Sequence, residues 1–211
     1  MKIAFIGCGN VGAPLASHLC NLGHEVTLAT KDPESESVRK AILRNPGLLT
    51  APSREAVAAA DVVFLATPFN ANAAALAELK SDLKGKILVD CTNPVGPGLS
   101  HGLNNEKAGS QFVQELVPDT EVVKAFTIYG FENFEDNSFP GYNVKPVMMF
   151  CGNDQQAKAM VGSLIAELGW EPLDVGGLEQ ALHLEHMTLL WIRLVRSGGS
   201  SPHTVWAALK K

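Results

Sequence analysis

Three glycines near the N-terminus have the spacing of a dinucleotide-binding turn. They form a G-x-G-x-x-G pattern that follows the apolar run "KIAFI" and precedes a segment of helical periodicity. In such a turn the first glycine permits the tight bend, the second lets the backbone approach a pyrophosphate, and the third lets helix and strand pack closely. The pyrophosphate would lie at the N-terminus of the helix, on backbone N–H groups. The residues expected to contact the dinucleotide here are Gly7, Cys8, Gly9, Asn10, Val11 and Gly12.

The residues after the second apolar run decide which dinucleotide is bound. Counting along "GHEVTLAT" puts Thr30 at the place where a side chain reaches the adenosine ribose, and Lys31 next to it. A hydroxyl followed by a cation favours a 2′-phosphate, whereas a carboxylate would accept hydrogen bonds from a free 2′-hydroxyl and repel the phosphate. Asp32 is the rival, because it lies about 20 residues beyond the last glycine. The register favours Thr30 and Lys31 and hence NADP, while Asp32 at the ribose would mean NAD.

Two later turns should end at the same edge of the sheet, because ligands of open α/β sheets bind outside the carboxyl ends of the strands. The turn "LATPFN" would line the path from adenosine to nicotinamide with Ala66, Thr67 and Pro68. The turn "VDCTNPVG" would place Asn93 nearer the nicotinamide ring, together with the residues on either side of it. The competing interpretation of the second turn is a plain Asn-Pro turn with no ligand.

These turns are positioned correctly if strands alternate with helices. Strand-like apolar runs alternate with helical periodicity through the first two thirds of the chain, which is typical of parallel β-α-β units. Runs such as "VVFLA" and "KILVD" are apolar on both faces, as expected when helices cover both sides of a sheet. Asn70 or Asn72 could cap the fourth helix. The predicted strands are 2–6, 25–29, 61–66, 86–90, 121–125 and 146–151, and the predicted helices are 11–22, 35–44, 53–59 and 71–80.

The C-terminal third has a different pattern. It predicts a helix over 154–168, a short strand "EPLDV", a long apolar helix over 178–195 and a short last helix over 204–209. The segment from Asn93 to Gly109 is rich in Gly, Pro and Asn and predicts a loop long enough to be functional. We therefore expect an α/β fold. It would consist of a doubly wound, mostly parallel Rossmann domain in residues 1–150 and a small, mainly helical portion in residues 151–211 that packs on it.

Composition restricts the class of partner. The chain has 211 residues, 46% of them hydrophobic, and a formal net charge of −5. No basic run resembles a nucleic-acid or anionic-membrane patch, so we expect a small-molecule partner. The first apolar run is too short for a signal peptide or a membrane span, which favours the cytoplasm. The four cysteines lie far apart without a C-x-x-C pair, so we expect them to be reduced packing residues.

Several of these segments together resemble the NADPH-dependent coenzyme F420 reductase family. They are the glycine turn, "GHEVTLATK", "DVVFLATP", "VVKAF" before a glycine- and aromatic-containing loop, and "CGND" before a helix. The similarity runs through most of the chain, and the oxidoreductase domain of the STEAP metalloreductases shares it. The resemblance implies a Rossmann domain with a small C-terminal portion. It also implies hydride transfer between nicotinamide C4 and a flavin or deazaflavin ring, with no metal in the domain itself.

The resemblance also assigns positions. Thr30 and Lys31 occupy the places of a serine and an arginine that contact the 2′-phosphate, Cys8 stands where a threonine is frequent, and Ala125 matches a small residue beside the nicotinamide. After that alanine the family often carries Asn or His followed by Thr, whereas this chain reads "KAFTIYGFENF". Aromatic side chains on this acceptor side could stack on an isoalloxazine-like ring, or they could fill the core. They are Phe126, Tyr129, Phe131 and Phe134.

No side chain is assigned as a catalytic acid, a catalytic base or a metal ligand. His183 and His186 share one face of the long C-terminal helix, but no third ligand has a clear spacing. These two and Glu185 would belong to a domain or dimer contact, or would line the substrate site. Lys124 is expected to be a solvated lysine at a strand end rather than a catalytic one. Direct hydride transfer between two rings needs proximity and orientation more than a side-chain base.

The function expected from the sequence is an NADP(H)-dependent oxidoreductase that transfers a hydride to a flavin or deazaflavin such as F420 or FMN. This acceptor would bind over the nicotinamide, between the 126–142 loop and the C-terminal helices. Two alternatives stay open: a reductase of a small imine or carbonyl compound, and a redox sensor that binds NADPH without turnover. Trp191 and Trp206 could cover a homodimer interface or complete the core of the monomer.

Overall fold

One eight-stranded sheet runs through the computed structural model, which describes residues 1–209 and 211. The strand order is β3-β2-β1-β4-β5-β6-β7-β8, and neighbouring strands are parallel except for the antiparallel pair β6 and β7. The order reverses between β1 and β4, which is the switch point of a doubly wound fold. The strands are β1 (Lys2–Ile6), β2 (Glu25–Ala29), β3 (Leu49–Ala51), β4 (Val62–Leu65), β5 (Ile87–Asp90), β6 (Glu121–Lys124), β7 (Val147–Gly152) and β8 (Glu171–Asp174).

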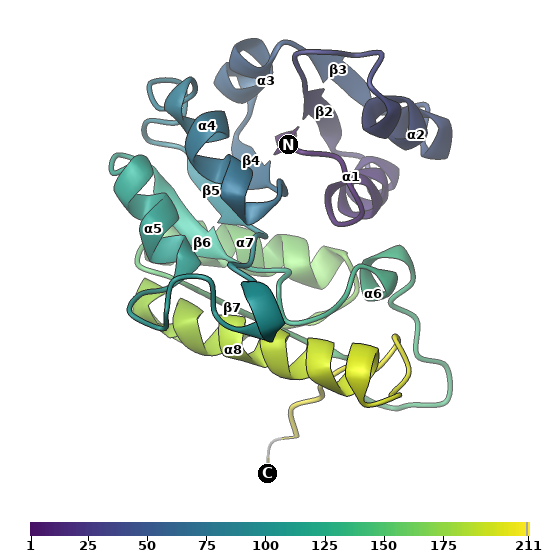
Figure 1. Ribbon diagram of the computed structural model, residues 1–211. Coiled ribbons are helices and arrows are strands. Elements are labelled where there is room, and N and C mark those ends of the chain that lie inside the picture. The colour runs from purple at the N-terminus through teal and green to yellow at the C-terminus, as the bar shows by residue number, and fades with distance from the viewer. Residues whose placement is uncertain (210) are drawn as a thin grey trace.

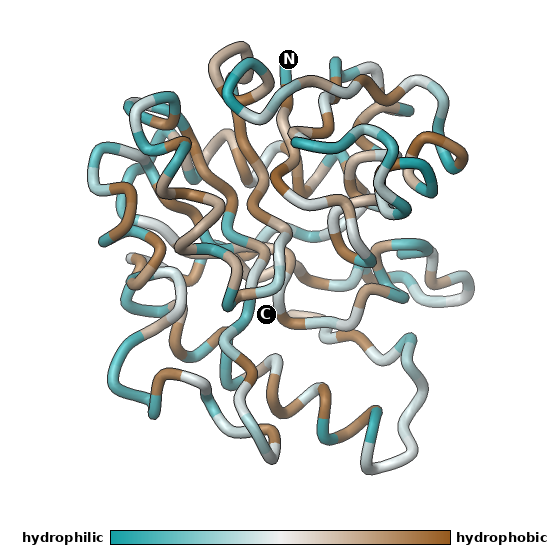
Figure 2. Tube along the Cα trace, turned by 45° about the horizontal axis from the view of Figure 1, so that its top comes forward, coloured by the Kyte–Doolittle hydropathy of each residue, from teal (hydrophilic) through white to brown (hydrophobic). Residues whose placement is uncertain are grey.

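Helices cover both faces of the sheet, which confirms the α/β Rossmann prediction (Figure 1). Alternate residues of β1 enter different cores: Ile3 and Phe5 pack with residues of α1 and α2, whereas Ala4 and Ile6 pack with residues of α3, α4 and α5. Figure 2 shows hydrophobic stretches of chain in the middle of the molecule, with hydrophilic stretches frequent towards its periphery. The helices are α1 (Gly12–Asn21), α2 (Glu36–Arg44), α3 (Ser53–Ala59), α4 (Asn72–Ala77), α5 (Gly109–Leu116), α6 (Glu132–Glu135), α7 (Gln155–Glu167) and α8 (Ala181–Ile192).

The predicted strands are confirmed to within one residue at each end, and β3 is an additional short strand. The long C-terminal helix is divided into a 3₁₀ turn (Leu178–Gln180), α8 and a π turn (Arg193–Ser197). The strand β7 continues across residue 150, and α7 packs on β6, β7 and β8. The division of the chain into 1–150 and 151–211 stays a prediction.

The predicted helix over 204–209 is wrong, because this segment has no regular structure. Its backbone is hydrogen-bonded elsewhere: the Trp206 carbonyl accepts from Val147 N–H (2.8 Å), and the Thr204 carbonyl accepts from Trp191 Nε1 (2.7 Å). These carbonyl groups are therefore not available for helical bonds. Trp191 lies in the core of the monomer at 1% exposure, and Trp206 packs against the same core.

The predicted cap of the fourth helix is also wrong. Ala71 precedes α4 without any side-chain cap, and Asn72 is its first residue. The Asn72 side chain is fully buried and bonds to two threonines instead. No helix within residues 1–209 is long and apolar enough to cross a bilayer.

Candidate functional site

The glycine turn links the end of β1 to the start of α1. Gly7 has φ +95°, and a Cβ added there would lie 2.7 Å from the carbonyl oxygen of Ala66, so this position requires glycine. A Cβ at Gly12 would overlap the carbonyl oxygen of Gly7. At Gly9, by contrast, an added Cβ meets no atom within 4 Å. Neighbouring atoms of the protein therefore exclude a side chain at the first and third positions. At the second position they do not, and its backbone is open to a molecule from outside.

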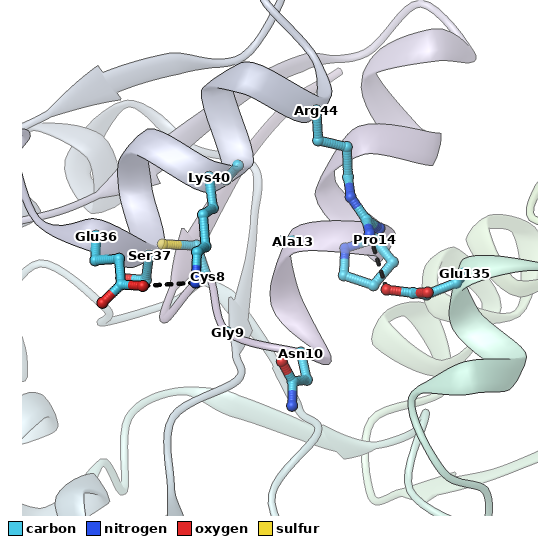
Figure 3. Close-up of a pocket in the computed structure, with 11 residues that line it drawn as sticks. Cys8, Gly9, Asn10, Ala13, Pro14, Glu36, Ser37, Lys40, Arg44 and Glu135 are labelled. Carbon is cyan, nitrogen blue, oxygen red and sulfur yellow. Dashed lines mark hydrogen bonds and ion pairs between the residues drawn. The ribbon is translucent and has the colours of Figure 1, made fainter.

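A cleft lies beside this open backbone, between α1, α2 and α6 (Figure 3). Cys8, Gly9 and Asn10 form one side of it. The cations on its other sides are paired: Lys40 with Glu36 (2.6 Å) and Arg44 with Glu135 (2.8 Å). The first turn of α1 carries no acidic side chain. No carboxylate of α1 therefore neutralises the positive end of its helix dipole, which lies at the glycine turn. This end of the helix suits a bound anion.

Thr30 and Lys31 directly follow β2, and the Asp32 carboxylate is bonded within the next turn. The Asp32 Oδ1 accepts from Glu34 N–H (2.9 Å), and Thr30 Oγ1 bonds the Asp32 backbone. This is a local turn in which the Asp32 carboxylate accepts a hydrogen bond from the backbone two residues further on. Lys31 Nζ lies 2.5 Å from Glu78 Oε2, and both side chains are mostly exposed. Within residues 1–209, Lys31 is thus held by a surface ion pair, which a stronger anion can displace.

The turns after β4 and β5 are joined by a buried hydrogen-bond chain. Thr67 Oγ1 donates to Asn72 Oδ1 (2.7 Å), and Asn72 Nδ2 donates to Thr92 Oγ1 (2.9 Å). Thr92 Oγ1 donates to Asp90 Oδ1 (2.7 Å), which also accepts from Thr92 N–H (2.9 Å). A Cβ on Gly7 would lie 2.9 Å from Thr67 N, so this chain begins beside the glycine turn.

Asn93 and Ala125 lie where neighbouring strands of the sheet end. Asn93 Nδ2 donates to the Thr127 carbonyl (3.3 Å), and Asn93 Oδ1 accepts from Thr188 Oγ1 of α8 (3.2 Å). Ala125 follows β6, is fully buried, and donates its N–H to the Asp90 carbonyl (3.2 Å). The predicted cofactor residues thus lie at the carboxyl edge of β1, β2, β4, β5 and β6, and the Asn93 side chain ties this edge to α8.

Three of the four aromatic side chains expected on the acceptor side belong to the core. Phe126 is buried with φ +56° and packs between Phe64 (5.9 Å between ring centroids) and Phe134 (6.2 Å). Tyr129 stacks on Trp170 at 5.2 Å and is also buried. These rings are engaged with other rings inside the protein. Phe131 is the one of these four that is only partly buried, and it packs against the same core.

Lys124 is not solvated, so that expectation is wrong. Its side chain is 0% exposed, and Nζ lies 3.0 Å from Glu185 Oε1 and 3.7 Å from Asp90 Oδ2, and donates to the Thr92 carbonyl (2.8 Å). Burial by itself lowers the pKa of this ammonium group, but the two carboxylates outweigh burial and raise the pKa above its ordinary value. Lys124 therefore holds two strand ends and α8 together.

Glu185 is the other unexpected member of this buried cluster. Its carboxylate accepts from Gly109 N–H at the start of α5 (2.9 and 3.0 Å) and lies 2.7 Å from His101 Nε2. Burial raises the pKa of Glu185, but Lys124, His101 and the Gly109 N–H outweigh it, so the pKa is lowered. The sequence signal was present: Glu185 is the only acidic residue of a helix rich in apolar residues, and a charge buried there needs a partner.

The two histidines beside Glu185 point outward. His183 is exposed, and His186 Nε2 lies 2.8 Å from Asn105 Oδ1. Among the described residues, no three His, Cys, Asp or Glu side chains group as metal ligands would. Cys91 and Cys151 are buried, and burial raises the pKa of both thiols, that of Cys151 to about 12. These two thiols are therefore unreactive at neutral pH.

Comparisons with known proteins identify the group to which these turns belong. A family model described as NADP oxidoreductase, coenzyme F420-dependent, matches residues 2–94, which include the turns after β1, β2, β4 and β5. A curated F420-dependent NADP reductase from Methanothermobacter thermautotrophicus is 30% identical, with 92% of this chain and 89% of that protein covered. The chain belongs to the F420-dependent NADP reductase family. It is an oxidoreductase of that family, and the resemblance expected from the sequence is confirmed.

The likeness to this reductase family includes the three-dimensional fold. A solved structure from Arthrobacter sp. FB24, a candidate F420-dependent NADP reductase, has 31% sequence identity and a TM-score of 0.86, with 96% of each chain covered. The rat metalloreductase STEAP3 is 28% identical over 89% of this chain, but the chain spans only 36% of the length of that protein. The F420-dependent reductases therefore match this chain over nearly the whole length of both proteins, whereas STEAP3 matches most of this chain with about a third of its own length.

Proposed function

We propose that this oxidoreductase transfers a hydride between NADP(H) and a deazaflavin or flavin ring, with F420 or FMN as the acceptor. The observation that carries the proposal is the glycine turn. Its first and third glycines are fixed by the protein, and its second presents open backbone beside the N-terminus of α1. Relatives named F420-dependent NADP reductases support both halves of the reaction.

The residues at the carboxyl edge of the sheet fit the parts of NADP(H). The glycine turn would hold the pyrophosphate with Gly7, Cys8, Gly9, Asn10, Val11 and Gly12. Thr30 and Lys31 would hold the 2′-phosphate, Lys31 through its ammonium group and Thr30 by turning its hydroxyl proton from the Asp32 carbonyl (2.9 Å) to the phosphate. The Asp32 carboxylate is engaged by its own turn. Ala66, Thr67 and Pro68 would line the path to the nicotinamide, and Asn93 and Ala125 would lie beside its ring.

The chemistry in this proposal belongs to the two rings, and the protein positions them. Bound NADPH supplies the hydride from nicotinamide C4. The charged side chains buried behind the site are paired with one another: Lys124 with Asp90 and Glu185, and Glu185 with His101. This protein would accelerate the transfer by holding the donor and acceptor rings close together and aligned.

Purified protein should oxidise NADPH in the presence of F420, followed as loss of absorbance at 340 nm. FMN and pyrroline-5-carboxylate are the parallel acceptors. Turnover with F420 or FMN supports the proposal. Turnover with pyrroline-5-carboxylate alone would replace it with an imine reductase, and tight NADPH binding without any turnover would replace it with a redox sensor.

Lys31→Ala should weaken NADPH binding by about 1.5–3 kcal/mol, roughly 10- to 150-fold, because a charged hydrogen bond to the 2′-phosphate is lost. The affinity for NADH should stay the same, since NADH lacks that phosphate. Dissociation constants from the fluorescence of the bound dinucleotides measure both. Asp32→Asn is the matched control and should change neither affinity. Loss of NADH affinity in Asp32→Asn, with NADPH affinity unchanged in Lys31→Ala, would show that the cofactor is NAD.

A further inference from the structure

The buried chain from Thr67 to Asp90 has a fixed direction of hydrogen-bond donation. It ends at the Asp90 carboxylate, where four donors converge. Oδ1 accepts from Thr92 N–H and Thr92 Oγ1, and Oδ2 lies 2.6 Å from Ser110 Oγ and 3.7 Å from Lys124 Nζ. Because Asp90 is the acceptor at this end, the single proton of the Thr92 hydroxyl is directed into it.

The remaining orientations follow in turn. The Thr92 hydroxyl already donates its proton in the hydrogen bond to Asp90. Towards Asn72 it can therefore only accept, so Asn72 must present its amide nitrogen (2.9 Å). Asn72 is 0% exposed and therefore has no water to satisfy its other side. Its carbonyl oxygen faces Thr67 and accepts the Thr67 hydroxyl proton (2.7 Å). At the outer end of the chain, Thr67 Oγ1 can therefore still accept a hydrogen bond but has no proton left to donate to a ligand.

The outer end of the chain is also where a ligand would meet it. Thr67 is only partly buried, in contrast to Asn72, Thr92 and Asp90, and its backbone N lies next to Gly7 of the glycine turn. Donation towards a carboxylate polarises each group along the chain, which makes the outermost oxygen a better acceptor. A phosphate oxygen, which is itself an acceptor, would be repelled there.

We infer that Thr67 is a positioning residue that accepts a hydrogen bond from a donor group of the dinucleotide, and that the buried Asn72–Thr92–Asp90 chain fixes it as an acceptor. The donor is a ribose hydroxyl or the nicotinamide carboxamide, and not the pyrophosphate or the 2′-phosphate. This inference rests on the proposed function, because it requires a dinucleotide at the glycine turn. Thr67 would thus recognise a donor group of the dinucleotide, whereas the glycine turn would hold its pyrophosphate.

The test is the dissociation constant of NADP⁺ for wild type, Thr67→Val and Thr67→Ser. Thr67→Val keeps the shape but removes the acceptor, and should weaken binding about 5- to 15-fold, whereas Thr67→Ser should stay within about twofold of wild type. Thr92→Val interrupts the chain and should also weaken binding. Thr120→Val is the matched control for Thr92→Val, because Thr120 is as buried as Thr92 and donates its hydroxyl to the Leu83 carbonyl (3.0 Å) before β6, at the opposite edge of the sheet. It should leave the affinity for NADP⁺ unchanged.

Two ligand analogues identify the donor. The 3-acetylpyridine analogue of NADP⁺ carries a methyl group in place of the carboxamide NH₂, and 2′,5′-ADP lacks the nicotinamide half. If Thr67→Val no longer affects binding of the acetylpyridine analogue, the donor is the carboxamide. If its effect persists with 2′,5′-ADP, the donor is the adenosine ribose. If it persists with the acetylpyridine analogue but not with 2′,5′-ADP, the donor is the nicotinamide ribose.

Two results would overturn the inference: wild-type affinity in Thr67→Val, or affinity as weak in Thr67→Ser as in Thr67→Val. Either of these, in a wild-type protein that binds NADP⁺, leaves the proposed function intact. Absence of NADP⁺ binding by the wild-type protein would instead contradict the proposed function itself.

Discussion

Gly9→Ala should weaken NADPH binding about tenfold or more while the protein stays folded, and Gly12→Ala should impair both folding and binding. The difference follows from what surrounds each glycine. A Cβ at Gly9 has no protein atom within 4 Å, so it would obstruct only a molecule that approaches the backbone from outside. A Cβ at Gly12 overlaps the Gly7 carbonyl oxygen, and relieving that overlap would cost about 3 kcal/mol of unfolding free energy.

Thermal denaturation and NADPH titration together separate the two effects. Gly23→Ala is the matched control, because Gly23 lies just beyond the other end of α1 with φ +91° and open space around it. It should cost about 1 kcal/mol of stability through backbone strain and leave NADPH affinity unchanged. Wild-type affinity in Gly9→Ala would show that the pyrophosphate does not lie on this turn.

The strands could be predicted because their signal is local. Runs such as "IAFI" and "VVFL" are apolar at every position, and the structure buries both faces of β1 and β4. The glycine turn could be predicted for the same reason, because consecutive residues contain both the glycine spacing and the strand and helix on either side of it. The turn at Asp32 is local as well, since its carboxylate bonds a backbone group only two residues away.

Elements that depend on distant partners could not be predicted in this way. The helix α5 begins at Gly109, and its first N–H groups include one that donates to Glu185 from α8. The segment 204–209 has residues that could form a helix, but Tyr129 and Val147 bond its backbone. In both cases a contact far along the chain decides the local structure, and composition alone does not reveal it.

The buried charges show the same limit within the site. Lys124 ends an apolar strand and looks solvated when it is considered alone. Its partners Asp90 and Glu185 come from another strand and from α8, so only the topology brings them together. Asn72 similarly looks like a helix cap, because its partners Thr67 and Thr92 lie in two different turns.

Lys124→Met should lower the unfolding free energy by about 3–5 kcal/mol, which is the usual cost of removing one partner of a buried ion pair. The variant leaves the Asp90 and Glu185 carboxylates buried without their shared cation. Urea unfolding measures the loss. Lys158→Met is the matched control: Lys158 is also buried, but its partner Asp174 (2.9 Å) is 42% exposed and can be hydrated after the change. Loss of this ion pair should lower the unfolding free energy of the control variant by about 1 kcal/mol or less.

The pH dependence of stability should change in the same variant. The pKa of Glu185 is lowered in the folded protein, so its contribution is present above the ordinary carboxyl value of 4.5 and is lost as the pH falls below it. The pKa of Lys124 is raised, so its contribution is present below 10.5 and is lost as the pH rises through the folded value. In Lys124→Met the folded pKa of Glu185 should rise, and the acid-side stabilisation from this carboxylate should shrink.

Combining Lys124→Met with Glu185→Gln distinguishes the ion pair from simple packing. Glu185→Gln alone removes the charge but keeps the shape, and it should also destabilise the protein because Lys124 loses a counter-charge. If the cluster is held by charge, the double variant should be more stable than the sum of the two losses predicts, by about 1–3 kcal/mol. Additive losses would mean that Lys124 acts through its buried methylene groups rather than its ammonium group. That result would also remove electrostatics as the reason why α8 is held against the strand ends that carry the proposed nicotinamide site.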